Sequence, residues 1–250
     1  YMPDDMLHKK YLRKKFGIDR ELEYKILEFI AEKREATKYD IHKVLKIPYS
    51  KVYETFKRFK GKDKDLIEEK IGEKTRAGLY KKIYTLTPEG IIHVLCFSKL
   101  KSYSQVLTYL RRNREAIPLS EVLDKAIEIG NVNDVKSIAG VAFDVISCRK
   151  EILVAKKPDD YTDAFGMFLC EISDSLAQDP RFSFTPLIEN EELRKTLIVA
   201  IINEIKKIAT EETIKDAFFE VVNDFIINSK TQLSFFEEFR AKAISTLKGN

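Results

Sequence analysis

Cationic, hydroxyl and aromatic side chains alternate with apolar ones in two stretches of the first half of the chain. In "YSKVYETFKRFK" (49–60), Val52, Phe56 and Phe59 recur at i, i+4 and i+7, which predicts a helix with one buried face. The opposite face carries the following side chains: Ser50, Lys51, Tyr53, Glu54, Lys57 and Arg58. Polar groups that reach base edges, together with cations that neutralise phosphates, are what a helix needs to bind in a DNA groove.

The second stretch is "GEKTRAGLYKKIYTLT" (72–87). The segment "GEKTRAG" (72–78) holds two glycines and predicts a loop, whereas "LYKKIYTLT" (79–87) alternates with the period of a strand. With "LIEEKI" (66–71) as the first strand, the sequence predicts a hairpin with a basic tip at Lys74, Thr75 and Arg76. Thr87 then caps a helix that begins at Pro88.

The elements before these stretches position them. Residues 21–36 have the apolar spacing of a helix, and Thr37 with Asp40 forms a capping-box pattern for a second helix over 38–47, which Pro48 ends. The second and third helices are therefore separated by the short distance of a helix-turn-helix. Lys38 and Tyr39 lie at the start of the second helix, where phosphate contact is favoured.

The order helix, helix-turn-helix, hairpin, helix resembles a winged helix-turn-helix domain of PadR-like and MarR-like regulators. The resemblance rests on "KVYETFKRF" (51–59), on "DLIEEKI" (65–71) and on "YTLTPEG" (84–90), and it spans about residues 20–98. It implies that the exposed residues of 49–60 read bases and touch phosphates, with Arg58 nearer the DNA backbone. It also implies that Lys74, Thr75 and Arg76 approach the minor groove or flanking phosphates.

Each assignment has an alternative. Glu54 is also placed to pair with Arg58 at i+4, and the ring of Tyr53 could belong to the edge of the core. Lys74 and Arg76 could serve only to keep the hairpin tip soluble.

The remainder of the chain is predicted to be helical. Residues 99–117 read as one connecting or dimer-forming helix, and further helices are predicted over 120–129, 133–154, 161–178, 189–209, 211–229 and 231–247. We expect a mainly α protein with a small β-hairpin wing, divided into a winged-helix domain (1–98), the connecting helix (99–117) and an all-helical domain (118–250). The phenylalanine-rich helices of the last domain predict a helical core, with a dimer interface or an apolar ligand pocket as alternatives.

Charge separates the two halves. Residues 1–117 hold 28 Lys and Arg against 17 Asp and Glu, whereas residues 118–250 hold 16 against 23. Only the first half is therefore expected to meet a polyanion. The Lys-, Glu- and Ile-rich composition is typical of archaeal or other thermophilic proteins. No leader sequence or membrane-length apolar run is apparent, and Cys96, Cys148 and Cys170 are too scattered for a disulfide framework, so we expect buried thiols and a cytoplasmic, nucleoid-associated protein.

These patterns favour a dimeric regulator that binds double-stranded DNA sequence-specifically, with no cofactor, metal or catalytic residue and no membrane contact. An adaptor of a DNA-processing or segregation complex, whose helical half binds protein partners, is the alternative. A metal-dependent nuclease would need the acidic residues Asp159, Asp160, Asp163, Glu171 and Asp174 to gather around an ion. Helix capping by Asp160 or Thr162 and surface roles for the rest explain these residues as well.

Overall fold

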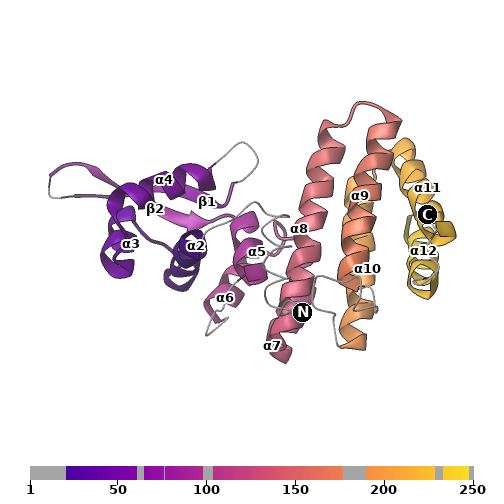
Figure 1. Ribbon diagram of the computed structural model, residues 1–250, viewed down its shortest axis with the longest axis horizontal. Coiled ribbons are helices and arrows are strands. Elements are labelled where there is room, and N and C mark those ends of the chain that lie inside the picture. Colours follow the sequence, from indigo (N-terminus) through magenta and orange to yellow (C-terminus); the bar gives the residue numbers. More distant parts are fainter. Residues whose placement is uncertain are drawn as a thin grey trace, which may run out of the picture. The chain divides into compact units, whose positions relative to one another are not determined.

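The chain has two compact units, divided between Ile117 and Pro118 (Figure 1). The computed structural model describes residues 21–60, 65–75, 77–97, 104–176, 190–228 and 233–247; of residues 97, 104–105, 173–176, 225–228 and 233–238 it describes the backbone alone. This part of the chain is mostly helical and contains one two-stranded sheet, which confirms the predicted fold class.

Three helices open the described part of the first unit: α2 (Glu21–Lys33), α3 (Lys38–Leu45) and α4 (Tyr49–Phe59). The capping box that begins α3 is confirmed, because the backbone N–H of Asp40 donates to Thr37 Oγ1 (3.1 Å) and the Asp40 carboxylate accepts from the Thr37 backbone N–H (3.0 Å). The apolar residues Ile41, Val44 and Leu45 predict a buried face for this helix, and that prediction is partly wrong. Ile41 is buried, but Val44 is 58% exposed, because α3 has only about two turns and buries only one side chain fully.

The wing is formed by β1 (Ile67–Lys74) and β2 (Tyr80–Leu86), which pair antiparallel from Ile67 opposite Leu86 to Ile71 opposite Lys82. A bulge follows, after which Lys74 pairs with Tyr80. The predicted loop over 72–78 is therefore too long, since its first three residues continue β1. Gly72 is suited to this strand position because a Cβ there would lie 2.5 Å from the Ile83 side chain.

The tip of the wing is closed by backbone hydrogen bonds around Thr75. Its N–H donates to the Leu79 carbonyl (2.7 Å), and its carbonyl accepts from Gly78 (2.9 Å), which has a φ of 78°. The Thr75 hydroxyl also accepts from the Leu79 N–H (3.2 Å). A glycine suits this left-handed backbone conformation because it has no Cβ.

The hairpin leads into α5 (Pro88–Phe97), whose cap is confirmed: Thr87 Oγ1 accepts from the Gly90 N–H (3.0 Å). Gly90 meets the backbone that precedes β1. A Cβ at this position would collide with the Leu66 carbonyl oxygen and lie 3.0 Å from its carbonyl carbon. The start of α5 can approach the strand this closely only without a side chain.

The last helix of the first unit is α6 (Ser104–Arg112), which is shorter than the helix predicted over 99–117. Residues 98–103 lie outside the described residues. The helix ends because Asn113 donates its side-chain amide to the Tyr109 carbonyl (2.9 Å), and the chain then turns, with the Ala116 N–H bonded to the Asn113 carbonyl (3.0 Å). Val106 and Leu110 are buried, and α6 packs against α2.

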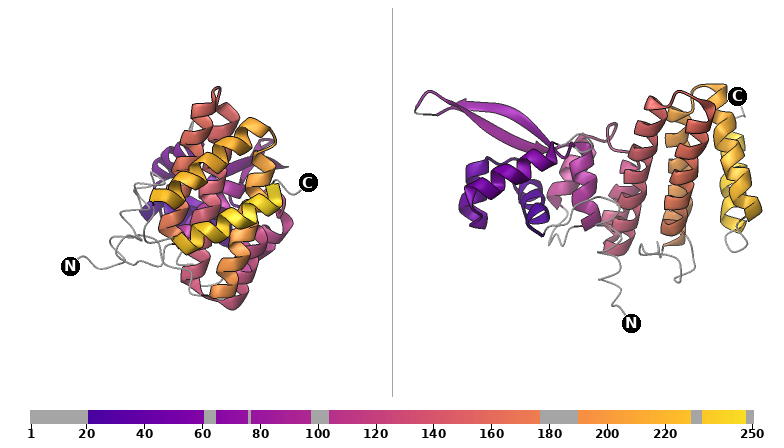
Figure 2. Two further views of the ribbon diagram at one scale, coloured as in Figure 1. Left: turned by 90° about the vertical axis from the view of Figure 1, so that its right-hand side faces the viewer. Right: turned by 45° about the horizontal axis from the view of Figure 1, so that its top comes forward.

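The described part of the second unit consists of helices (Figure 2): α7 (Ser120–Ile129), α8 (Val132–Val154), α9 (Pro158–Leu176), α10 (Glu191–Ile208), α11 (Glu212–Asn228) and α12 (Leu233–Leu247). These bounds agree with the predicted helices to within three residues. Helix α9 packs between α8 and α11, while α10 contacts α7, α8 and α12. A phenylalanine cluster joins α9, α11 and α12, since the centre of the Phe218 ring lies 5.2 Å from that of Phe165 and 6.1 Å from that of Phe239. The predicted core role of Phe225, Phe235 and Phe236 lies outside the described side chains.

Gly90 gives a stability prediction. Gly90→Ala should lower the free energy of unfolding of the first unit by about 3 kcal/mol, the upper end for overpacking, because the obstacle is backbone rather than a movable side chain. Gly166→Ala is the matched control. This glycine lies within α9 with nothing within 4 Å of its added Cβ, so alanine should stabilise α9 slightly. Thermal unfolding followed by circular dichroism measures both changes. A Gly90→Ala variant that melts at the same temperature as Gly166→Ala would contradict the packing described for Gly90.

The capping box of α3 gives a second prediction, which depends on pH. The hydrogen bond from the Thr37 hydroxyl is the main cause that lowers the pKa of Asp40. A carboxyl with a lower pKa in the folded protein contributes stability that is complete above its unfolded pKa of about 4 and is lost as the pH falls through the folded pKa. Thr37→Val should therefore reduce hydrogen-exchange protection of the α3 amides about fivefold at pH 7, for a loss of about 1 kcal/mol.

The same difference should shrink as the pH falls below about 4 and through the lower pKa at which the wild-type carboxyl becomes protonated in the folded protein. Asp40→Asn separates charge from geometry, since its amide oxygen can still accept a hydrogen bond but does not titrate. Its protection should not change with pH over this range. A Thr37→Val effect that is constant with pH would show that the carboxylate does not take part.

Candidate nucleic-acid interface

The exposed face of α4 carries the side chains that the sequence singled out. Val52, Thr55, Phe56 and Phe59 are buried, and all the residues that the sequence singled out are exposed: Ser50, Lys51, Tyr53, Glu54, Lys57 and Arg58. Tyr53 is 48% exposed, which places its ring on the surface and not inside the core. The helix therefore has one buried side for packing, apolar except for Thr55, and one polar, net cationic side for contact.

Arg58 lies at the flank of this face. Its Nε is 3.0 Å from Glu23 Oε1 of α2, and its Nη2 donates to Thr55 Oγ1 (3.2 Å). Glu23 is only 8% exposed, so the ion pair neutralises a nearly buried carboxylate. Arg58 therefore pairs with Glu23 of α2, whereas the alternative raised from the sequence paired it with Glu54. Only the part of the Arg58 guanidinium that stays exposed beside Glu23 is available to a ligand.

Lys38, the first residue of α3, lies among aromatic rings. Its Nζ is 4.3 Å from the centre of the Tyr53 ring, 5.2 Å from that of Phe56 and 5.3 Å from that of Tyr84. Desolvation lowers the pKa of Lys38, Glu69 opposes this effect, and the neighbouring cations Lys82, Lys60 and Lys57 lower it further. The sequence placed Lys38 at a phosphate; the structure also gives it a cation–π role that joins α3 to α4.

Glu69 of β1 connects the same region to the wing. Its carboxylate accepts from the Tyr84 hydroxyl (3.0 Å) and forms an ion pair with Lys82 Nζ (2.8 Å). Hydrogen bonding by Lys82 is the main cause that lowers the pKa of Glu69, whereas burial is the main cause that raises the pKa of Tyr84. Tyr84 is buried against Phe56, with ring centres 4.6 Å apart. Strand β2 is therefore held to the underside of α4.

Tyrosine and histidine side chains extend the exposed face across the turn between α3 and α4. Tyr39 is 59% exposed and Tyr49 is 50% exposed, and the ring of His42 lies 6.4 Å from the first and 6.0 Å from the second. His42 Nδ1 lies 2.6 Å from the Ile47 carbonyl oxygen, which ties the ring to the turn. The sequence selected Tyr39 but missed Tyr49 and His42. Tyr49 could have been found as the first residue of the helix after Pro48, on its exposed side.

Two of the three predicted wing-tip residues are described. Lys74 is exposed, and its Nζ lies 5.2 Å above the ring of Tyr80. The polar groups of Thr75 form the hydrogen bonds that close the tip, so its hydroxyl stabilises the hairpin in addition to any contact it makes with a ligand. Arg76 lies outside the described residues.

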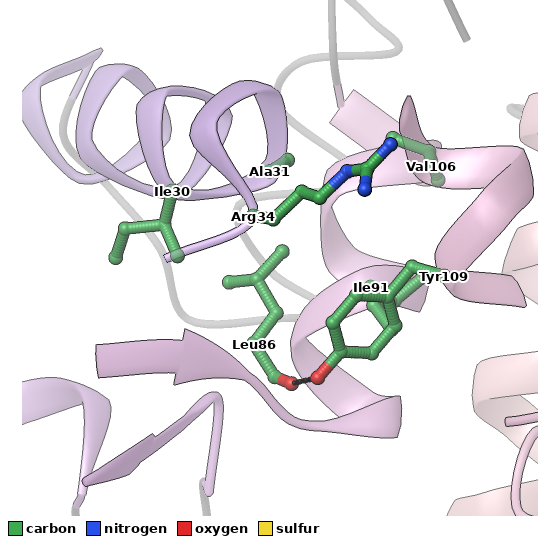
Figure 3. A pocket seen from close by; sticks show the side chains of 7 residues that line it. All are labelled: Ile30, Ala31, Arg34, Leu86, Ile91, Val106 and Tyr109. Carbon is green, nitrogen blue, oxygen red and sulfur yellow. Dashed lines mark hydrogen bonds between the residues drawn. The ribbon is translucent and has the colours of Figure 1, made fainter. Parts of the chain in front are cut away.

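One hollow of the first unit has apolar walls and a cation at its rim (Figure 3). It is lined by residues of α2, β2, α5 and α6 and the residue after α2: Ile30, Ala31, Arg34, Leu86, Ile91, Val106 and Tyr109. The Tyr109 hydroxyl donates to the Leu86 carbonyl across it. Its volume is about 10 Å³, room for one water molecule at most. The hollow is a packing seam between α6 and the winged helix, too small for an organic effector.

The acidic residues that a metal-dependent nuclease would need are not gathered in the described part of the chain. Among the described residues, no group of three His, Cys, Asp or Glu side chains could hold a metal ion. Asp160 instead accepts hydrogen bonds from the backbone N–H groups of Lys156 and Lys157 at the start of α9. Cys96 and Cys148 are buried as expected, but Cys170 is exposed. No helix within the described ranges is both long enough and apolar enough to cross a membrane.

Comparison with known proteins gives one match. Residues 12–89 match the family described as "Sugar-specific transcriptional regulator TrmB", while searches of curated proteins and of solved structures gave no significant match. The match covers less than a third of the chain and includes α2 to β2 and the start of α5. The helices and hairpin within it fit a winged helix-turn-helix, and the narrower PadR-like and MarR-like assignment remains a prediction. Over residues 12–89, this chain is similar to the winged-helix domain of TrmB regulators.

Proposed function

We propose that this protein is a transcriptional regulator that binds double-stranded DNA sequence-specifically. The observation that carries the proposal is the exposed face of α4, which is polar and cationic over a buried apolar side and lies within the residues that match a regulator family. The cationic first half of the chain supports it, because a polyanion would relieve the repulsion that Lys82, Lys60 and Lys57 exert on Lys38. As a DNA-bound regulator it would act in the cytoplasm, on the nucleoid.

In this proposal α4 enters the major groove. Ser50, Lys51, Tyr53 and Glu54 reach base edges or nearby phosphates from its first half, and Lys57 reaches a phosphate from its second. Tyr39 and Lys38 flank the helix at the start of α3, and Arg58 touches the DNA backbone with the part of its guanidinium that Glu23 leaves exposed. Lys74, Thr75 and Arg76 bring the wing to the adjacent phosphates.

We further propose that two copies bind together, so that two α4 helices enter successive major grooves about one helical turn apart. The sugar in the description of the matched family is not assigned to a site here. The match ends at residue 89, before α6 and before the whole second unit. The second unit is the place where an effector or a second copy would bind, since its acidic surface suits DNA poorly.

Lysine substitutions on α4 test the proposal. The probe is a fluorescein-labelled 30-bp duplex, selected by binding from a random-sequence pool, and its anisotropy is titrated at several salt concentrations. Lys51→Ala and Lys57→Ala should each weaken binding and reduce the slope of log K against log salt by about 1, because each removes one phosphate contact. Lys195→Ala is the control: Lys195 is comparably exposed but lies on α10 and should leave the slope unchanged.

Glu54→Ala should change the preferred sequence while leaving the salt slope nearly unchanged, because a carboxylate can accept from a cytosine amino group but releases no counterion. Repeating the selection with the variant measures this. A wild-type chain that binds no duplex at low salt, or that binds without salt dependence, would refute the proposal.

The adaptor alternative is favoured by one observation. At the end of α8, Leu153 is 77% exposed and Val154 is 74% exposed, and such neighbouring apolar side chains suit a protein contact. If the chain is an adaptor, Leu153→Ser with Val154→Ser should release a protein that co-purifies with the full chain, and the wild type should fail the duplex titration. This alternative is excluded if the wild type binds DNA at low salt and the double variant binds it equally well.

A further inference from the structure

The two faces of the β1–β2 hairpin carry different side chains in the part that is not buried. Strand alternation places Ile67, Glu69 and Ile71 on the same face as Leu86, Tyr84 and Lys82, and the bulge adds Lys74 opposite Tyr80. We call Ile71, Lys74, Tyr80 and Lys82 the inner face of the wing, since they continue the face that packs on α4. Leu79 and Lys81 belong to the outer face, on the other side of the same hairpin.

The inner face carries two large apolar side chains in solvent. Ile71 is 77% exposed and Tyr80 is 60% exposed, and the register makes them diagonal neighbours across the strands. Lys74 lies over the Tyr80 ring, and Lys82 is directly opposite Ile71. The apolar pair is therefore bracketed by two ammonium groups.

This face is continuous with the exposed face of α4. The Nζ of Lys38 lies over the rings of both Tyr53 and Tyr84, and Glu69 accepts from the Tyr84 hydroxyl and pairs with Lys82. The hairpin extends beyond the helices of the unit (Figure 2). A ligand seated on α4 would therefore meet the inner face next.

The charges nearby favour a polyanion as the occupant. The Glu69 carboxylate is neutralised by Lys82, and Glu68 is on the outer face with Lys70, 3.5 Å away. Glu73 lies in the bulge. Apolar side chains flanked by lysines suit the DNA minor groove, where such residues enter between base steps while cations hold the two phosphate strands.

We propose that Ile71 and Tyr80 form an apolar wedge that enters the minor groove beside the segment read by α4 and bends the duplex. Lys74 and Lys82 hold the phosphates on either side of the wedge. This inference rests on the proposed DNA binding and adds a second means of recognition, since a base step that unstacks easily would be preferred at a position that α4 does not touch.

The test uses the same selected duplex, now with a fluorophore at each end, so that energy transfer reports bending and anisotropy reports binding. The wild type should raise the transfer efficiency. Ile71→Ser and Tyr80→Ser should each abolish this rise and weaken binding about tenfold, close to the lower end for burying one apolar side chain, with the salt slope unchanged. Both residues are exposed, so the fold should persist, and circular dichroism checks this.

Leu79→Ser is the matched control, because Leu79 is 70% exposed on the outer face and should affect neither bending nor binding. The wedge is refuted if the wild type binds without bending, if Leu79→Ser acts like the inner-face variants, or if those variants alter self-association in sedimentation and leave DNA bending intact. Failure of the wild type to bind any duplex is a separate result, which refutes the proposed function as well.

Discussion

The packing of Tyr84 is the contact on which the winged unit depends. Its ring meets Phe56 edge to face at 4.6 Å, its hydroxyl donates to Glu69, and its backbone exchanges two hydrogen bonds with Ala36, just after α2. One residue of β2 thus joins the wing, the helix α4 and the segment between α2 and α3. The angle between hairpin and helix, which any shared ligand would sense, is determined there.

Cations gather around this contact although the fold itself does not need them all. Lys38 is held by three rings, and the pKa of its ammonium group is lowered, mainly by desolvation. Lys82 is held by Glu69. Both lysines are held in place by the fold, and a bound anion would offset the repulsion that Lys82 exerts on Lys38. The arrangement is of the kind that favours binding over stability of the free protein.

Local sequence signals predicted local structure well. The capping box at Thr37, the buried stripe of α4 and the helices of the second unit follow from spacing of a few residues, and each was found where expected. What failed depends on partners distant in sequence. The Arg58–Glu23 pair and the rings around Lys38 follow from tertiary packing, which neither propensity nor periodicity encodes. The candidate site was therefore predictable as a set of exposed residues, whereas the contacts that orient them were not.

The closed tip of the wing has an entropic consequence. Thr75 makes hydrogen bonds through its N–H, its carbonyl and its hydroxyl, and Gly78 supplies the left-handed turn, so the backbone at these two residues is already fixed by the fold. Ordering one residue costs about 1–2 kcal/mol in backbone entropy. A loop that ordered only on contact would subtract this from the affinity at each of its residues. At Thr75 and Gly78 folding has already met that cost, so these two residues would lose no further backbone entropy when the wing meets a ligand.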